Sequence, residues 1–252
     1  MKMNGKTVVV FGVANEQSIA WHVASHLLEA GANVHITYQQ KFKSRVLQLL
    51  RNADVQPAGV HRCDVTSPEE VSATFAAIGS PLHALIHCVA FTPYENFSRA
   101  VHENPAEDFH TTMEISAWSL LHVVRAAAPY FAPSASVVAM SYLGAQRVVP
   151  GYRMMGIAKA ALESSVRELA AAVGPDGVRV NAISAGPLKT LAALAIPDFD
   201  KMLDHYAEVA PMRRCVQAED VANLTAFLCS EGARNITGQT LYVDAGYSIL
   251  GT

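Results

Sequence analysis

Residues 7–20 read TVVVFGVANEQSIA, and this stretch decides the fold expected for the start of the chain. The unbroken, β-branched run at residues 7–11 is typical of a strand that is buried on both faces. Gly12 supplies the tight turn that follows it. Ile19, Val23 and Leu27 then recur four residues apart, as on one side of a helix. The stretch therefore predicts a strand, a glycine turn and a helix over residues 18–30.

The rest of the chain continues this alternation. Strands are expected at residues 34–38, 60–63, 84–89, 136–140, 178–183 and 240–243, and helices at residues 42–50, 68–77, 105–130, 152–173, 201–209 and 218–229. Alternating strands and helices predict an α/β protein: a single-domain, Rossmann-type, doubly wound parallel sheet of about seven strands flanked by helices, over residues 1–252. The irregular stretch at about residues 188–205 follows a strand end, where such folds place loops that cover ligands.

Composition excludes several classes of protein. The chain has 252 residues, 51% of them hydrophobic, and a formal net charge of -3, so neither a disordered chain nor a nucleic-acid partner is expected. Its four cysteines form no CxxC pair, and no cluster has zinc spacing, so we expect reduced thiols and no metal. No apolar run approaches the ~20 residues of a membrane span or resembles a secretory segment. We therefore expect a soluble, cytoplasmic protein without a membrane partner.

The first turn suggests a nucleotide site without proving one. It lacks the GxGxxG pattern, but Gly12 stands where the first glycine is needed, and the next helix offers free N–H groups to a pyrophosphate. Ser18 can cap that helix or donate to phosphate. Gln39 ends the second strand, where many such folds carry an acid for the ribose. Asp64 ends the third strand, where it can accept from an adenine amino group or cap a turn.

The strongest chemical signal is a set of three side chains, Tyr142, Tyr152 and Lys159. Tyr142 lies at the end of an expected strand, at the sheet edge where α/β sites form. Tyr152 and Lys159 are seven residues apart on an expected helix, which places them within ~20° of one face and ~10.5 Å apart along the axis. The lysine can then hold a nicotinamide ribose while its charge favours the tyrosinate. Taken alone, such a pair is usually incidental.

Several motifs together make a more specific pattern. They are Gly12 to Ala20 (G-x5-S-I-A), Thr37-Tyr38-Gln39, Cys63-Asp64-Val65, residues 141–145 (SYLGA), Tyr152 with Lys159 (Y-x6-K), residues 181–187 (NAISAGP), residues 236–239 (ITGQ) and Val243-Asp244. Over nearly its whole length the chain resembles the short-chain dehydrogenase/reductase superfamily, and within it the enoyl-acyl carrier protein reductases. The wider superfamily uses Y-x3-K, and Gly156 stands at that place here.

The resemblance implies an NADH-dependent reductase of fatty-acid synthesis acting on an enoyl group bound to acyl carrier protein. It implies Tyr142, Tyr152 and Lys159 as catalytic residues, with Tyr152 donating to the enolate oxygen. Cofactor contacts are implied for Gly12, Ser18, Ile19, Gln39, Asp64, Val65, Val89, Lys159, Leu188, Lys189, Thr190, Leu191 and Ala192. Substrate contacts are implied for Ala90, Thr92, Tyr142, Met155, Ile196, Phe199 and Met202. Ala90 stands where many relatives have glycine, and we expect its methyl group to narrow the space for flat aromatic inhibitors that stack on the nicotinamide.

Some alternatives stay open. Lys41, Lys43 and Arg45 could attract the 2′-phosphate of NADPH or form a solvated helix face; we favour NADH because Gln39 is uncharged. The substrate could be another enone or carbonyl compound of a short-chain reductase, or the chain could be a regulatory protein with an inactive site. Met155 could belong to the core instead of the acyl pocket. Relatives form homotetramers, and the apolar faces of the helices at residues 105–130 and 152–173 suit that assembly or a plain core.

Overall fold

One parallel sheet forms the centre of the protein. The computed structural model describes residues 2–79, 81–191 and 193–251. Within these ranges seven strands lie in the order β3-β2-β1-β4-β5-β6-β7, and every neighbouring pair is parallel. The strands are β1 (Thr7–Phe11), β2 (Asn33–Tyr38), β3 (Gly59–Arg62), β4 (Leu82–His87), β5 (Phe131–Tyr142), β6 (Arg179–Ala185) and β7 (Thr240–Val243). This confirms the expected sheet.

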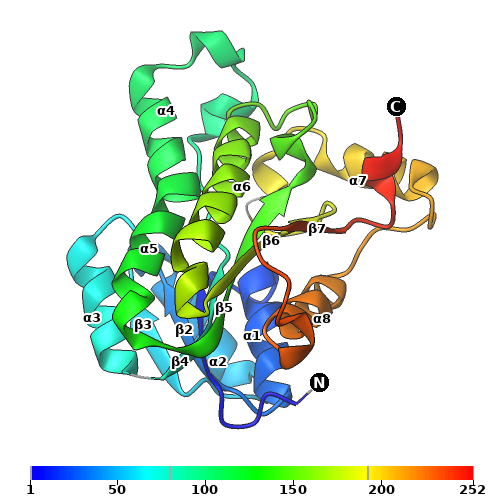
Figure 1. The fold of residues 1–252 in the computed structure, drawn as a ribbon. Helices are drawn as coiled ribbons and strands as arrows, with labels where there is room; N and C mark the ends of the chain where they lie inside the picture. Colours follow the sequence, from blue (N-terminus) through cyan, green and yellow to red (C-terminus); the bar gives the residue numbers. More distant parts are fainter. Residues whose placement is uncertain (1, 80, 192, 252) are drawn as a thin grey trace.

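Helices cover both faces of the sheet. They are α1 (Ile19–Glu29), α2 (Lys43–Asn52), α3 (Pro68–Ile78), α4 (Ala106–Met113), α5 (Ser119–Ala127), α6 (Met154–Val173), α7 (Phe199–Val209) and α8 (Ala218–Leu228). The helices α1, α2 and α8 pack on one face, whereas α3, α5 and α6 pack on the other (Figure 1). The predicted doubly wound architecture is therefore confirmed. Among the described residues no helix is both long enough and apolar enough to cross a membrane.

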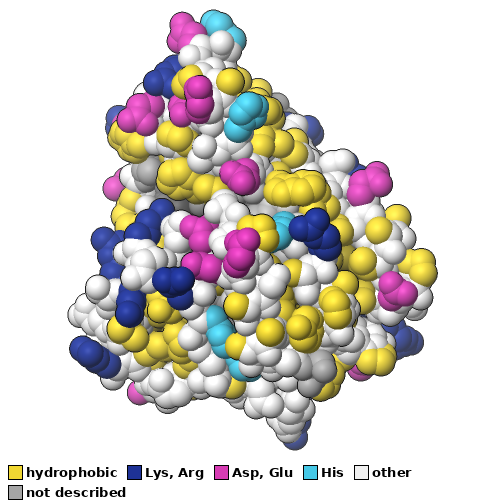
Figure 2. Space-filling model, turned by 90° about the vertical axis from the view of Figure 1, so that its left-hand side faces the viewer, with side chains coloured by type: hydrophobic (Ala, Val, Ile, Leu, Met, Phe, Trp, Pro, Cys, Tyr) yellow, Lys and Arg dark blue, Asp and Glu magenta, His cyan; other side chains and the backbone are white. Residues whose placement is uncertain are grey.

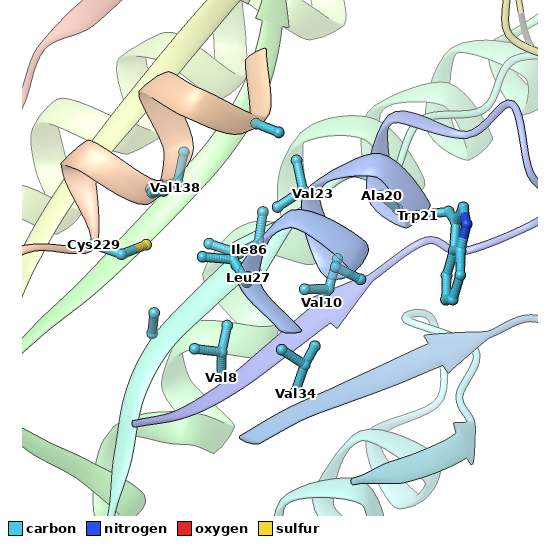
Figure 3. Packing of buried hydrophobic residues seen from close by; sticks show 14 of the residues in the cluster. Val8, Val10, Ala20, Trp21, Val23, Leu27, Val34, Ile86, Val138 and Cys229 are labelled. Carbon is cyan, nitrogen blue, oxygen red and sulfur yellow. The ribbon is translucent and has the colours of Figure 1, made fainter. Parts of the chain in front are cut away.

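The apolar run of β1 divides between two cores. Val8 and Val10 belong to the core under α1 and α8, and Val9 and Phe11 belong to the opposite core. Figure 3 shows Val8 and Val10 close to Leu27 of α1, in the layer between the helix and the sheet. Both faces of a parallel strand are covered, which is why the run shows no alternation of polar and apolar residues.

The helix expected at residues 105–130 is interrupted. A π-helical turn, Glu114–Trp118, separates α4 from α5, and a 3-10 turn, Ala128–Tyr130, ends the segment. In the π turn the Ser116 hydroxyl accepts from the Phe91 N–H at 2.9 Å and donates to the Phe91 carbonyl at 2.8 Å. The turn thus ties the helical segment to the loop after β4. An apolar repeat does not reveal such an inserted residue, so the sequence predicted one regular helix.

The helix expected at residues 152–173 begins two residues later, at Met154. Gly151 has φ +78° and Arg153 has φ +45°, and neither value belongs to a right-handed helix. Tyr152 therefore lies in the turn before α6, and the prediction that Tyr152 and Lys159 share one helix face is wrong. Their relation depends on this turn, which hydrophobic periodicity does not report.

The sheet reverses its winding direction between β1 and β4. The strands β2 and β3 extend the sheet on one side of this pair, and β5, β6 and β7 extend it on the other. In such folds ligands bind in the crevice outside the carboxyl ends of the strands at this switch. Gly12, with φ +98°, turns the chain there, and a Cβ atom on it would collide with the Cys88 carbonyl. Only glycine allows β1 and the segment after β4 to approach so closely.

Candidate active site

A cavity of about 530 Å³ opens at the carboxyl ends of the strands. Its size falls in the range of small-molecule sites. The residues predicted to contact the cofactor that line it are Gly12, Ser18, Ile19, Gln39, Asp64, Val65, Val89, Lys159, Leu188, Thr190 and Leu191. The residues predicted to contact the substrate that line it are Ala90, Thr92, Tyr142, Met155, Ile196, Phe199 and Met202. Tyr152 lines it too, so one cavity gathers residues from six strand ends.

Two predicted cofactor residues do not join this lining. The Lys189 ammonium lies 2.7 Å from the Asp200 carboxylate of α7, and its side chain is 63% exposed. Lys189 therefore links the loop after β6 to α7 instead of facing the cavity. Ala192 lies outside the residues that the structure describes.

The end of the cavity near β1, β2 and β3 is polar. Ser18 caps α1: its hydroxyl accepts from the Trp21 N–H at 3.4 Å and donates to the Asn15 carbonyl at 2.6 Å. The Gln39 amide donates to Asp64 at 2.8 Å. Burial alone would raise the pKa of the Asp64 carboxyl, but the hydrogen bonds from Gln39 and Thr66 lower it. Asp64 is thus an ionised acceptor at neutral pH, and it both holds a turn and faces the cavity.

Two tyrosines meet in the middle of the cavity. The ring centroids of Tyr142, the last residue of β5, and Tyr152 are 4.7 Å apart, with the rings edge to face at 67°. Burial raises the pKa of Tyr152 far above its ordinary value, and the neighbouring Tyr142 adds to this. Burial also raises the pKa of Tyr142, to about 12. Both hydroxyls therefore keep their protons and can donate hydrogen bonds, so the expected tyrosinate is not favoured here.

Lys159 lines the same cavity and is 5% exposed. Its ammonium donates to the Met140 carbonyl of β5 at 2.8 Å. Burial lowers its pKa to about 8, and Cys88 and then Glu163, one turn further along α6, oppose that shift. At neutral pH Lys159 carries a charge and retains donors for a further acceptor.

The opposite end of the cavity is apolar. Phe199 and Met202 of α7 close it, and the Tyr142 hydroxyl lies 3.8 Å from the Met202 sulfur. Thr92 also lines this end, but its hydroxyl is engaged by Thr112 at 2.7 Å and Asn96 at 2.8 Å. Thr92 therefore shapes the wall and offers no spare donor.

The sequence reasoning missed several lining residues on the loop after β4. Cys88, Phe91 and Tyr94 line the cavity with Ala90 and Thr92. The Lys41 ammonium lies 4.9 Å from the centre of the Phe91 ring, so the two side chains meet at the cavity edge. Residues 88–94 directly follow the carboxyl end of β4, and this position is the sequence signal that predicts their place at the site. No group of metal-ligating side chains occurs among the described residues.

A sequence profile of the family described as Enoyl-(Acyl carrier protein) reductase matches residues 12–248, nearly the whole chain. This chain belongs to the enoyl-acyl carrier protein reductase family. The resemblance inferred from the motifs is thereby confirmed.

Individual members of the enoyl-acyl carrier protein reductase family agree with this assignment. The enoyl-[acyl-carrier-protein] reductase [NADH] FabI of Nostoc sp. is 42% identical, with 100% of this chain and 99% of the relative covered. The protein of the same name from Neisseria meningitidis is 43% identical, with 98% and 96% covered.

Solved structures of enoyl-acyl carrier protein reductases share the fold closely. The Bacillus cereus enzyme, solved with NADP+ and indole naphthyridinone, superposes with a TM-score of 0.96 at 41% identity, and both chains are covered completely. The Anaplasma phagocytophilum enzyme, solved with NAD, superposes with a TM-score of 0.92 at 38% identity, covering 99% of this chain and 96% of the other.

Proposed function

We propose that this protein reduces the C=C bond of a trans-2-enoyl thioester with NADH, as an enoyl-acyl carrier protein reductase of fatty-acid synthesis. The family and its NADH-named relatives support the reaction class. The observation that carries the proposal is the cavity in which the neutral hydroxyl of Tyr152 and the charged ammonium of Lys159 lie together.

The polar end of the cavity fits a dinucleotide. Gly12 lines the cavity, and α1 begins beside it with free N–H groups that suit a pyrophosphate. Asp64 and Gln39 offer acceptors to an adenosine, and Lys159 offers donors to the nicotinamide ribose. When bound, the reduced nicotinamide supplies a hydride to the β-carbon of the enoyl group. Gln39 carries no charge to attract a 2′-phosphate, which supports NADH over NADPH.

The protein's own part in the reaction is to stabilise charge. Hydride addition at the β-carbon places negative charge on the thioester oxygen as an enolate. A proton added at the α-carbon, from water or a relay, then completes the reduction. Tyr152 keeps its proton and donates a hydrogen bond to that oxygen, which stabilises the charge most where water is excluded. Tyr142, edge to face with Tyr152, orients the thioester from the other side. Lys159 fixes the ribose so that the two reacting carbons face one another.

The segment at residues 188–205 is proposed to act as a lid over the acyl chain. Its second part is the start of α7, where Phe199 is buried and Met202 touches Tyr142. The ion pair of Lys189 with Asp200 joins its two parts. An apolar lid of this kind holds an acyl chain and keeps water from the enolate.

The proposal also covers the carrier of the substrate, the oligomeric state of the enzyme and its location in the cell. The acyl group is proposed to arrive on acyl carrier protein, in the cytoplasm. We also propose a homotetramer, since Phe109 of α4 and Trp118 of the π turn are hydrophobic and 38% and 55% exposed. Figure 2, which looks onto the side that carries α3 and α4, shows hydrophobic side chains gathered between charged ones in its upper half.

The test is reduction of a trans-2-enoyl thioester, followed by the loss of reduced-nicotinamide absorbance with NADH or NADPH. Wild type is expected to consume NADH faster than NADPH. Tyr152→Phe is expected to lower kcat by a factor of ~10²–10³, because one hydrogen-bond donor to the enolate oxygen is gone. Parallel assays with a ketone and with another enone measure the alternative of a different short-chain reductase. Normal NADH binding without turnover of any enoyl thioester would refute the proposed reaction.

A further inference from the structure

Glu163 is a buried carboxylate behind the active site. It lies on α6, four residues after Lys159, and is only 4% exposed. A buried carboxylate is costly unless hydrogen bonds and a nearby positive charge compensate it. Its presence in this part of the core therefore calls for a structural reason.

Both oxygens of Glu163 are used. Ser141 donates to Oε1 at 2.6 Å, and Gln146 donates to Oε2 at 3.1 Å. Ser141 and Gln146 are the two ends of a six-residue segment that leaves β5. One carboxylate on α6 thus fastens both ends of that segment to the helix. We call residues 141–146, with this attachment, the tethered segment.

The tethered segment carries the contacts that position the two active-site tyrosines. Tyr142 directly follows Ser141 and ends β5. Gly144 packs so closely on the Tyr152 ring that a Cβ atom on Gly144 would overlap it. Gly156 of α6 in turn packs on the Gly144 carbonyl. A shift of the segment would therefore move Tyr142 and free the Tyr152 ring together.

We propose that Glu163 is a positioning residue of the reductase, which holds Tyr142 and Tyr152 in place by hydrogen bonds to both ends of the tethered segment. This inference rests on the proposed enoyl reduction. Because Tyr152 is not part of α6, the helix alone does not orient it. A displacement of about 1 Å at a reacting centre can cost ~10²-fold in rate, so loss of the tether is expected to lower turnover.

Two variants of similar size separate hydrogen bonding from charge. Glu163→Gln removes the charge but keeps an oxygen for Ser141, and its amide can bond the Gln146 side chain if that side chain turns over. Glu163→Met fills the same space without polar atoms. Both lose the charge beside Lys159 equally, so their difference reports the hydrogen bonds. Glu168→Gln, an exposed position on the same helix, is the matched control.

The measurements are kcat and KM for the enoyl thioester, the dissociation constant of NADH and the thermal midpoint. We expect Glu163→Met to lose at least ~tenfold in kcat with nearly unchanged NADH affinity, and Glu163→Gln to stay within ~threefold of wild type. Full turnover in Glu163→Met overturns the inference, because a buried methionine then serves as well. Equal losses in the Gln and Met variants also overturn it, because the charge alone would then matter.

A second variant covers the case in which Glu163→Met does not fold. Ser141→Ala combined with Gln146→Ala removes both donors and leaves Glu163 in place, and the same loss of kcat is expected. Full turnover in that double variant overturns the inference. Failure of the proposed function is a separate result: wild type itself would then reduce no enoyl thioester in these assays.

Discussion

Lys159 should set the alkaline limit of activity. Burial lowers the pKa of its ammonium from 10.5 to about 8. A fall of this size corresponds to ~3 kcal/mol of preference for the neutral amine in the folded protein. With a pKa of about 8, roughly a tenth of the lysines stay charged at pH 9. Because kcat/KM for NADH reports the free enzyme, we expect it to fall ~tenfold between pH 7 and pH 9.

The contribution of Lys159 to the free energy of unfolding should rise with pH while activity falls. The loss of activity can therefore be told apart from unfolding of the protein. Between pH 8 and pH 10.5 the unfolded chain keeps the Lys159 proton that the folded chain releases. The unfolded state binds more protons in this window, so the contribution of Lys159 to the free energy of unfolding rises with pH. By pH 9 the increase is ~1.4 kcal/mol. Activity is thus expected to fall while this contribution to stability grows.

Initial rates are measured from about pH 6 to about pH 10, a range that spans the lowered pKa of Lys159. Urea unfolding of wild type and Lys159→Met is measured over the same range. The methionine variant has no such proton to release, so subtracting its pH dependence isolates Lys159 from the other titrating groups. A flat kcat/KM up to pH 10 would refute the reasoning. Parallel stability curves for wild type and Lys159→Met would refute it equally.

Three further predictions concern the cavity walls. Gly12→Ala should weaken NADH binding and lower the thermal midpoint, because its Cβ would meet the Cys88 carbonyl; calorimetry and NADH titration check this, and unchanged values for both would exclude the close approach. Ala90→Gly should widen the space for flat aromatic inhibitors that stack on the nicotinamide, so inhibition by triclosan should be stronger in the variant than in wild type. Equal inhibition of both proteins would show that the Ala90 methyl group does not narrow this space. Lys41→Ala should leave kcat/KM with NADH within ~threefold, because the Lys41 ammonium lies near Phe91 at the cavity edge; a selective loss with NADPH would instead show that Lys41 binds the 2′-phosphate.

The sequence predicted the sheet well because a strand that is buried on both faces is apolar along its whole length, and such a run is visible in the sequence. Short, β-branched runs bounded by turn residues, such as residues 7–11 before Gly12, favour a buried strand over a helix, and the strand–helix alternation then predicts the architecture. Strand ends were less certain. β5 extends to Tyr142, two residues beyond the expected end at residue 140, because Ser141 and Tyr142 still pair with Ser184 and Ala185 of β6. Pairing with a distant strand is not visible in a local pattern.

The sequence predicted which residues form the site better than it predicted how their side chains are arranged. The rule that ligands bind at strand ends, together with the motifs, gathered residues that do line one cavity. The side-chain bonds made by some of the predicted site residues, inside the cavity lining or outside it, were not predictable. Thr92 is engaged by Thr112 and Asn96, and Lys189 is paired with Asp200. These partners lie on other elements, so only the folded chain brings them together.

The spacing of Tyr152 and Lys159 carries the most instructive difference. Helical geometry predicted that one helix holds both side chains, but the turn at Arg153, where φ is +45°, places Tyr152 before α6. A tyrosine outside the helix depends on its neighbours for its position. Those neighbours are Gly144, against its ring, and Tyr142, edge to face with it. Because Glu163 of α6 fastens the segment that carries both, the helix still controls Tyr152, through hydrogen bonds instead of through its own backbone.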